Sequence, residues 1–350
     1  MDIVVQAILR GKAISLNRDQ FFYSIILLFY YLLFFVSLAY TASPKYSYEK
    51  VYLFLPCILS FFYGLFIVKI DLKLLYKLYL ILFLPSAVWF LIGRNIYYTP
   101  LNRSFFNESF LLINTNYLNY GVGVAIMILL NIYLKKNKLL LLSLFLVLLG
   151  LGSRGSLLFL LLILLFWKIK PLAHFFMLNF RINRRKIPYI FTSFLALFVL
   201  GAFYGKKIVT FIEVGIYRFQ SLLQFSEDKS STERIDALGF AFNDIFGSLP
   251  TFLIGNGIGS YGILYNGLDK REYPHNIFVE AWFELGLLGL LLLLILLISP
   301  FFLFKDKKQM LFLLIFSFLL LNAMKTGDMV SIWTTYALSG ILIFKVNGRV

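Results

Sequence analysis

Long apolar stretches separated by short polar segments dominate this chain. Most stretches approach the length of about 20 residues that a helix needs to cross a bilayer. A β-barrel would show short strands of alternating apolar and polar residues, whereas residues 285–303 are almost continuously apolar. The pattern predicts ten spans, at residues 21–40, 51–68, 78–93, 117–134, 139–152, 156–167, 188–204, 285–304, 310–324 and 331–344.

Composition and charge agree with that pattern. The 350 residues are 60% hydrophobic and 14% charged, which excludes an ordinary water-soluble protein. If the N-terminus lies inside, the inside segments hold twenty of the 33 Lys and Arg residues but only four of the 17 acidic ones. This distribution follows the positive-inside rule, places both termini in the cytoplasm and removes the case for a nucleic-acid partner. We therefore predict an all-α, polytopic transmembrane helical bundle of about ten spans.

One segment differs from the rest. Residues 205–284 carry 17 of the 50 charged residues, and the predicted topology puts them outside. The expected organisation is seven spans in residues 1–204, one large external (periplasmic), partly helical loop at 205–284, and three spans in residues 285–350. Within the loop, Ser230 to Glu233 fits a capping box that would start a helix. Its apolar face, with Ile235, Leu238, Phe242 and Ile245, could rest on the bundle or on the bilayer surface, and Arg234 would lie at the edge of that face.

Two residues stand where chemistry could occur. Arg154, in Gly150-Leu-Gly-Ser-Arg-Gly155, lies between two long apolar runs, where an arginine is costly unless it meets a partner or a ligand. It could snorkel to an interface, or its guanidinium could clamp phosphate oxygens. His275 stands in Tyr273-Pro-His-Asn276, just before an apolar helix, and could be a general base or a structural cap.

Other patterns exclude several classes of site. Gly255-Asn-Gly-Ile-Gly-Ser-Tyr-Gly262 resembles a dinucleotide fingerprint but has no βαβ context, so it predicts a turn-rich loop. One cysteine and two distant histidines cannot form a usual zinc site, and no Asp-x-Asp pair is present. The sequence implies no metal and no cofactor.

Four motifs together resemble the O-antigen ligase/polymerase superfamily of bacterial membrane glycosyltransferases. They are Gly152-Ser-Arg-Gly155 after a span, Glu233-Arg-Ile235 on a helix, Pro250 followed by Gly255-x-Gly257-x-Gly259-x-Tyr261, and His275-Asn-x-Phe-x-Glu280 leading into Glu284-Leu-Gly-Leu-Leu-Gly289. The motifs cover residues 140–300, and the last is the most specific. The resemblance implies a glycosyltransferase C-like fold in the bacterial cytoplasmic (inner) membrane, with its active site on the outer face.

The resemblance also implies roles for individual residues. Arg154 and Arg234 would hold the diphosphate of a polyprenyl-diphosphate-linked glycan, and His275 would activate the acceptor hydroxyl. Candidates for substrate contact are Arg218, Asn276, Glu280, Tyr261, Lys325 and Asp328, although a solvated interfacial role is the alternative for Lys325 and Asp328.

The function expected from this resemblance is a polysaccharide repeat-unit polymerase. It would transfer a glycan from one lipid-diphosphate-linked oligosaccharide to another, by metal-independent inverting displacement, and a chain-length regulator protein is a candidate partner. Two alternatives stay open: a ligase that transfers the glycan to lipid A core, and a non-enzymatic transporter or flippase.

Overall fold

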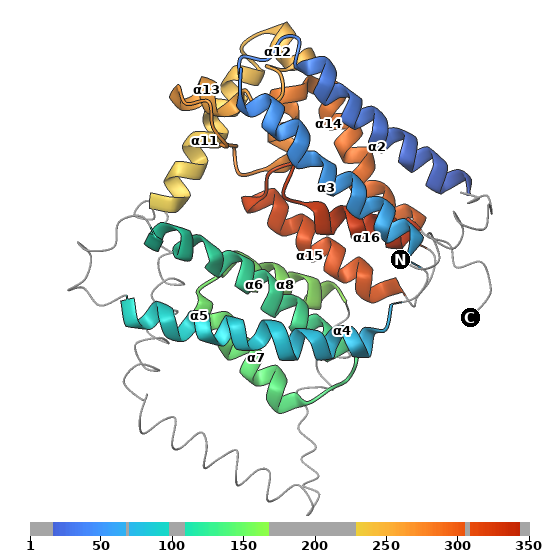
Figure 1. Ribbon diagram of the computed structural model, residues 1–350, viewed down its shortest axis with the longest axis vertical. Helices are drawn as coiled ribbons and strands as arrows, with labels where there is room; N and C mark the ends of the chain where they lie inside the picture. Colours follow the sequence, from blue (N-terminus) through green and yellow to red (C-terminus); the bar gives the residue numbers. More distant parts are fainter. Residues whose placement is uncertain (1–16, 68–69, 98–108, 168–228, 305–308, 344–350) are drawn as a thin grey trace, which may run out of the picture. The chain divides into compact units, whose positions relative to one another are not determined.

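The computed structural model describes residues 17–67, 70–97, 109–167, 229–304 and 309–343 (Figure 1). These residues form helices joined by turns and loops, and no strand occurs among them. The prediction of an all-helical chain is confirmed for this part of the protein.

Nine of the ten predicted spans coincide with apolar helices in the described ranges, and the tenth, at residues 188–204, lies outside them. Four helical stretches there are long and apolar enough to cross a membrane: Arg18–Ser37, Tyr46–Phe66, Leu72–Phe90 and Ile277–Leu303. Several shorter apolar helices accompany them. The chain is thus a helical, multi-pass membrane protein, while the number of spans stays a prediction.

The chain divides into two compact units. The first combines the N-terminal 70 residues with residues 229–350. Its helices are α2 (Arg18–Ser37), α3 (Tyr46–Phe66), α11 (Lys229–Ile245), α12 (Leu249–Ile254), α13 (Tyr261–Asn266), α14 (Ile277–Leu303), α15 (Met310–Thr326) and α16 (Trp333–Ile343). The second unit contains α4 (Leu72–Leu78), the π-helical turn η1 (Tyr79–Phe83), α5 (Leu84–Tyr97), α6 (Ser109–Tyr133), α7 (Lys138–Leu151) and α8 (Arg154–Phe166).

Small residues let α3 and α16 lie close together in the first unit. A methyl group at Gly64 would come within 1.9 Å of the Ala337 carbonyl oxygen, and one at Gly340 within 2.3 Å of the Phe61 carbonyl oxygen. Such contacts are typical of helices that pack in a bilayer, where backbones approach through small side chains. The crossing fixes the position of α3, whose first turns adjoin the candidate site.

Helix α14 is kinked at Gly286, and a glycine-rich loop closes the kink. Gly286 has φ +66° and ψ −167°, so the helical hydrogen bonds are interrupted there. The N–H groups of Asn256 and Gly257 donate instead to the carbonyls of Phe283 and Glu284, at 2.9 and 2.8 Å. The segment predicted as a turn-rich loop at residues 255–262 therefore donates hydrogen bonds to α14 carbonyls at the kink. It is part of the scaffold.

The predicted helix in the external loop is present as α11, but its predicted capping box was wrong. The helix already includes Lys229, so Ser230 lies inside its first turn and not at the cap. The buried face contains Ala237, Ala241 and Ile245, whereas Ile235 and Phe242 are exposed. Ala237 and Ala241 pack in one cluster with Tyr261 of α13 and Phe283 of α14. Their small side chains let α11 approach these helices closely.

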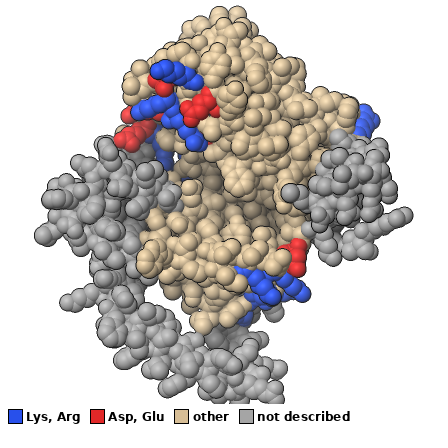
Figure 2. Space-filling view, viewed as in Figure 1, with Lys and Arg blue, Asp and Glu red and all other residues tan. Residues whose placement is uncertain are grey.

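Charged side chains are sparse over the visible face of the molecule. They gather in a few clusters in Figure 2, and one of these lies where Figure 1 shows α11 and α13. Apart from these clusters, the described residues in that view are neither Lys, Arg, Asp nor Glu. This distribution suits a protein whose charged chemistry is confined to the ends of apolar helices.

Candidate active site

His275 occupies the turn that leads into α14. Asn276 is the N-cap of that helix, and its side-chain oxygen accepts hydrogen bonds from the N–H groups of Phe278 and Val279, at 3.0 and 3.3 Å. The preceding His275 has φ +57°, a left-handed conformation that few residues other than glycine adopt. Backbone strain of this kind concentrates at functional sites, so the turn itself marks His275 as a candidate.

The surroundings of His275 keep its imidazole neutral near pH 7. The ring is half-buried and meets the edge of Tyr273, with ring centroids 4.9 Å apart. Burial lowers the pKa of His275, and the positive charge of Arg234 lowers it further, whereas Glu233 and Glu272 oppose the shift. A neutral imidazole can accept a proton, which is what a general base requires.

Arg234 reaches the same region from α11. It lies one turn before Ala237 on the buried side of that helix, and its own side chain is half-buried. The phenol oxygen of Tyr261 donates to the Ala237 carbonyl oxygen at 2.9 Å, which ties this turn of α11 to α13. The charge of Arg234 lowers the pKa of His275, so the structure brings these two predicted site residues, forty-one positions apart in the sequence, near each other.

A buried ion cluster lies beneath the start of α14, and sequence reasoning missed its cation. The Lys50 ammonium contacts a Glu280 carboxylate oxygen at 2.5 Å and both Glu284 oxygens at 2.7 and 2.8 Å. All three side chains are fully buried. The second Glu280 oxygen accepts from the Met329 N–H at 2.8 Å. The sequence signal that could have predicted this cluster is a lysine at the edge of one apolar segment and two glutamates four residues apart at the start of another.

A second ion pair connects the turn before α14 to the end of α15. Arg271 donates from Nε to Asp328 at 2.8 Å, and its terminal nitrogen lies 2.7 Å from the same oxygen. Asp328 is buried, and its other oxygen accepts from the Ser331 N–H. Lys325 lies in the last turn of α15. Arg271 was also missed, because nothing local distinguishes it from a solvated loop residue.

Asp269 attaches the same loop to α3. Its carboxylate accepts hydrogen bonds from the Ser43 hydroxyl at 2.6 Å and from the N–H groups of Lys45 and Tyr46 at 2.8 and 3.2 Å. The N-cap residue of α3, Lys45, makes no capping bond of its own. A loop residue more than 220 positions away thus caps α3, and the cap holds the His275 segment against that helix.

Most of the predicted contact residues serve the protein itself. Asn276 caps α14, Tyr261 is buried against α11, Glu280 is ion-paired, and Asp328 holds Arg271. Direct contact of Glu280 or Asp328 with a substrate would require that these buried pairs open. Sequence spacing identified residues near the site, but it could not show that their polar groups already have partners.

Arg154 belongs to the second unit. Gly152 ends α7 in a left-handed conformation, with φ +65°, and Arg154 begins α8 directly afterwards. The Ser153 hydroxyl donates to that of Ser156 at 2.9 Å, which closes the turn. His275 belongs to the first unit, and Arg218 lies outside the described residues. The relation of Arg154 and Arg218 to His275 stays a prediction.

Within the described ranges, no three His, Cys, Asp or Glu side chains come together as a metal site would require. What the first unit does assemble is an imidazole with a lowered pKa, a nearby guanidinium and a set of ion-paired carboxylates. Such a set can accept a proton from a hydroxyl and attract a phosphate-bearing ligand.

Comparison with protein families gives one match: residues 139–294 fit the family described as O-antigen ligase (Wzy_C). The matched region contains Arg154, Arg234 and His275. Searches of curated proteins and of solved structures gave no match.

Proposed function

We propose, from the match of residues 139–294 to the O-antigen ligase family, that this multi-pass membrane protein is a polysaccharide repeat-unit polymerase. It transfers a glycan from a polyprenyl diphosphate to the non-reducing end of a second lipid-linked unit. The site lies at the outer face of the bacterial inner membrane, and both termini are cytoplasmic. The family supports glycosyl transfer, and the polymerase assignment is our extension of it.

The observation that carries this proposal is that Arg234 lies near enough to His275 to lower the pKa of its imidazole. A half-buried histidine with a lowered pKa, held in a left-handed turn, is suited to accept a proton at neutral pH. The adjacent guanidinium is suited to bind an anionic leaving group. His275 directly precedes the polar end of α14, one of the four candidate spans, where a lipid-anchored substrate would present its head group.

In the proposed reaction the acceptor hydroxyl attacks the anomeric carbon of the donor sugar. The bond from that carbon to the diphosphate oxygen breaks, and its electron pair leaves with the polyprenyl diphosphate. The hydroxyl proton passes to His275, and attack from the face opposite the leaving group inverts the configuration. Arg154 and Arg234 neutralise the charge that grows on the diphosphate, because preorganised cations act strongly in a water-poor site.

Four of the contact residues predicted from the sequence contribute by position. Asn276 and Glu280 fix the first turn of α14, and so orient His275, which directly precedes it. Tyr261 and Asp328 hold the α11 turn and the Arg271 loop in place. Lys325 and Arg218 are proposed to contact the glycan or phosphate. A chain-length regulator is proposed as a partner of the assembled enzyme.

A reconstitution tests the proposal. The purified protein in lipid receives only lipid-diphosphate-linked repeat units, and the products are scored for longer glycans and free polyprenyl diphosphate. We expect a ladder of products, which His275→Ala abolishes. His174→Ala is the matched control, because His174 is the other histidine in the chain and lies in a predicted cytoplasmic loop.

The outcomes separate the alternatives. Products that form only after lipid A core is added would make the protein a ligase. No glycosyl transfer to either acceptor, from correctly inserted protein, would refute the enzyme and favour a transporter. Near-normal transfer by His275→Ala would remove the histidine from the mechanism while leaving the polymerase in place.

A further inference from the structure

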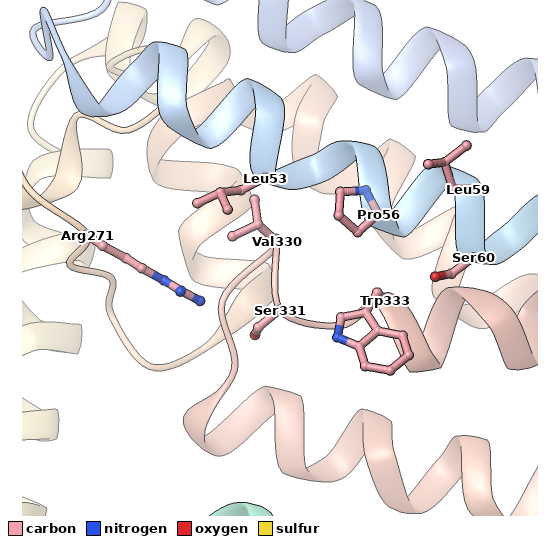
Figure 3. A pocket seen from close by; sticks show the side chains of 8 residues that line it. All are labelled: Leu53, Pro56, Leu59, Ser60, Arg271, Val330, Ser331 and Trp333. Carbon is pink, nitrogen blue, oxygen red and sulfur yellow. The ribbon is translucent and has the colours of Figure 1, made fainter. Parts of the chain in front are cut away.

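A groove of about 560 Å³ lies beside the Arg271 loop in the first unit (Figure 3). Leu53, Pro56 and Leu59 of α3 form one wall, and Val330 and Trp333 form the other. The Arg271 side chain extends into the space between them from the loop before α14. The volume is in the range of small-molecule sites, which are typically apolar with a few placed polar groups.

The apolar wall is in a position to meet lipid. Helix α3 is one of the four candidate spans, and Leu59 is 68% exposed on it. Trp333 is 53% exposed at the first residue of α16, and tryptophan is enriched where a bilayer meets water. The groove therefore combines a lipid-accessible aliphatic surface with one cation at its polar end, which is the complement of an anionic lipid.

Arg271 is oriented in advance for such a ligand. Its Nε and one terminal nitrogen both bond a single Asp328 oxygen, and Asp328 is itself held by the Ser331 N–H. Asp328 is 1% exposed, whereas the Arg271 side chain is 48% exposed. A guanidinium has five N–H donors. With one edge fixed on the buried carboxylate, the remaining donors face outward at little further cost in side-chain entropy.

We propose that this groove binds the first isoprene units of the polyprenyl diphosphate carrier, with Arg271 donating to its diphosphate oxygens. This inference rests on the proposed function and adds a binding site to it. Arg271 and His275 are four positions apart in the chain, which spans at most about 14 Å, and Tyr273 lies between them. Burial raises the pKa of Tyr273, whereas the positive charges of Arg271 and Arg234 lower it. Both guanidinium groups therefore lie near that phenol.

Binding can be measured apart from transfer, because Trp333 lines the groove. The full-length protein in phosphatidylcholine nanodiscs is titrated with undecaprenyl diphosphate while tryptophan fluorescence is recorded, and Trp333→Phe identifies the signal from the groove. Undecaprenol tests the need for phosphate, and phosphatidic acid tests whether any anionic phospholipid suffices. We expect undecaprenyl diphosphate to bind at least about tenfold more tightly than either.

Two variants test the walls and the cation. Ser60→Phe fills the groove from α3 and should weaken binding about tenfold, whereas Ser143→Phe, at an exposed serine of α7, should not. The double variant Arg271→Gln with Asp328→Asn removes both charges and leaves no buried carboxylate unpaired. It should lose the preference for the diphosphate over undecaprenol.

The readings distinguish this inference from the proposed function. Selective binding at Trp333 without transfer would support the groove and contradict the polymerase. Transfer with no response of Trp333, or with unchanged binding in Ser60→Phe, would overturn the groove and leave the polymerase standing. Equal binding of phosphatidic acid would make the groove a general lipid site and refute the inference.

Discussion

Removing the cation of the Lys50 cluster should destabilise the protein strongly. In Lys50→Met, two buried carboxylates would lose their shared partner, to which they now bond at 2.5 to 2.8 Å. Glu280 would keep its hydrogen bond from the Met329 N–H. All three side chains are fully buried, so solvent cannot replace the lost contacts. Breaking a buried ion pair by removing one partner typically costs about 3–5 kcal/mol.

A thermal unfolding measurement in detergent checks this estimate. By the scaling of domains of 150–250 residues, a loss of about 3–5 kcal/mol corresponds to a fall in Tm of roughly 6–20 °C. Lys45→Met is the matched control, because Lys45 is exposed at the start of the same helix and should change stability by less than about 0.5 kcal/mol.

A rescue separates the effect of charge from that of packing. Adding Glu280→Gln and Glu284→Gln to Lys50→Met removes the unpaired charges, and we expect much of the lost stability to return. If Lys50→Met costs no more than Lys45→Met, the buried cluster does not hold α3 to α14 and our reasoning is wrong. If the triple variant is the least stable, hydrogen bonding and not charge balance governs the cluster.

Three further predictions concern the surrounding structure. Arg234→Gln should raise the pKa of His275, because a nearby positive charge is removed. The acid limb of the pH profile of kcat/KM should therefore move to higher pH, and an unmoved limb would contradict the effect of Arg234 on His275. Asp269→Ala should lower the free energy of unfolding by about 0.5–2 kcal/mol, since α3 loses its cap, and unchanged thermal unfolding would refute this. Gly286→Ala should cost at least about 1–3 kcal/mol, because φ is +66° and a methyl group would lie 2.2 Å from the Leu253 carbonyl oxygen, whereas Gly239→Ala, in open space on α11, should be neutral or stabilising by the same assay.

The helical and membrane character of the chain follows from the sequence alone. Hydrophobic length and period are local properties, so nine predicted spans coincide with helices, within a few residues at most boundaries. The position of His275 before an apolar helix was also readable, because Asn276 is a strong N-cap. Motif resemblance then pointed to the family that residues 139–294 match.

Only the tertiary structure decided which polar groups meet. Lys50 and Glu280 are 230 positions apart, and the local sequence around either residue does not predict their contact. The sequence likewise could not show which side of α11 packs inside the protein: Ile235 and Phe242 are exposed, whereas Ala237 and Ala241 are buried. Helix formation depends on neighbours in the chain, whereas burial and ion pairing depend on which surfaces meet in space.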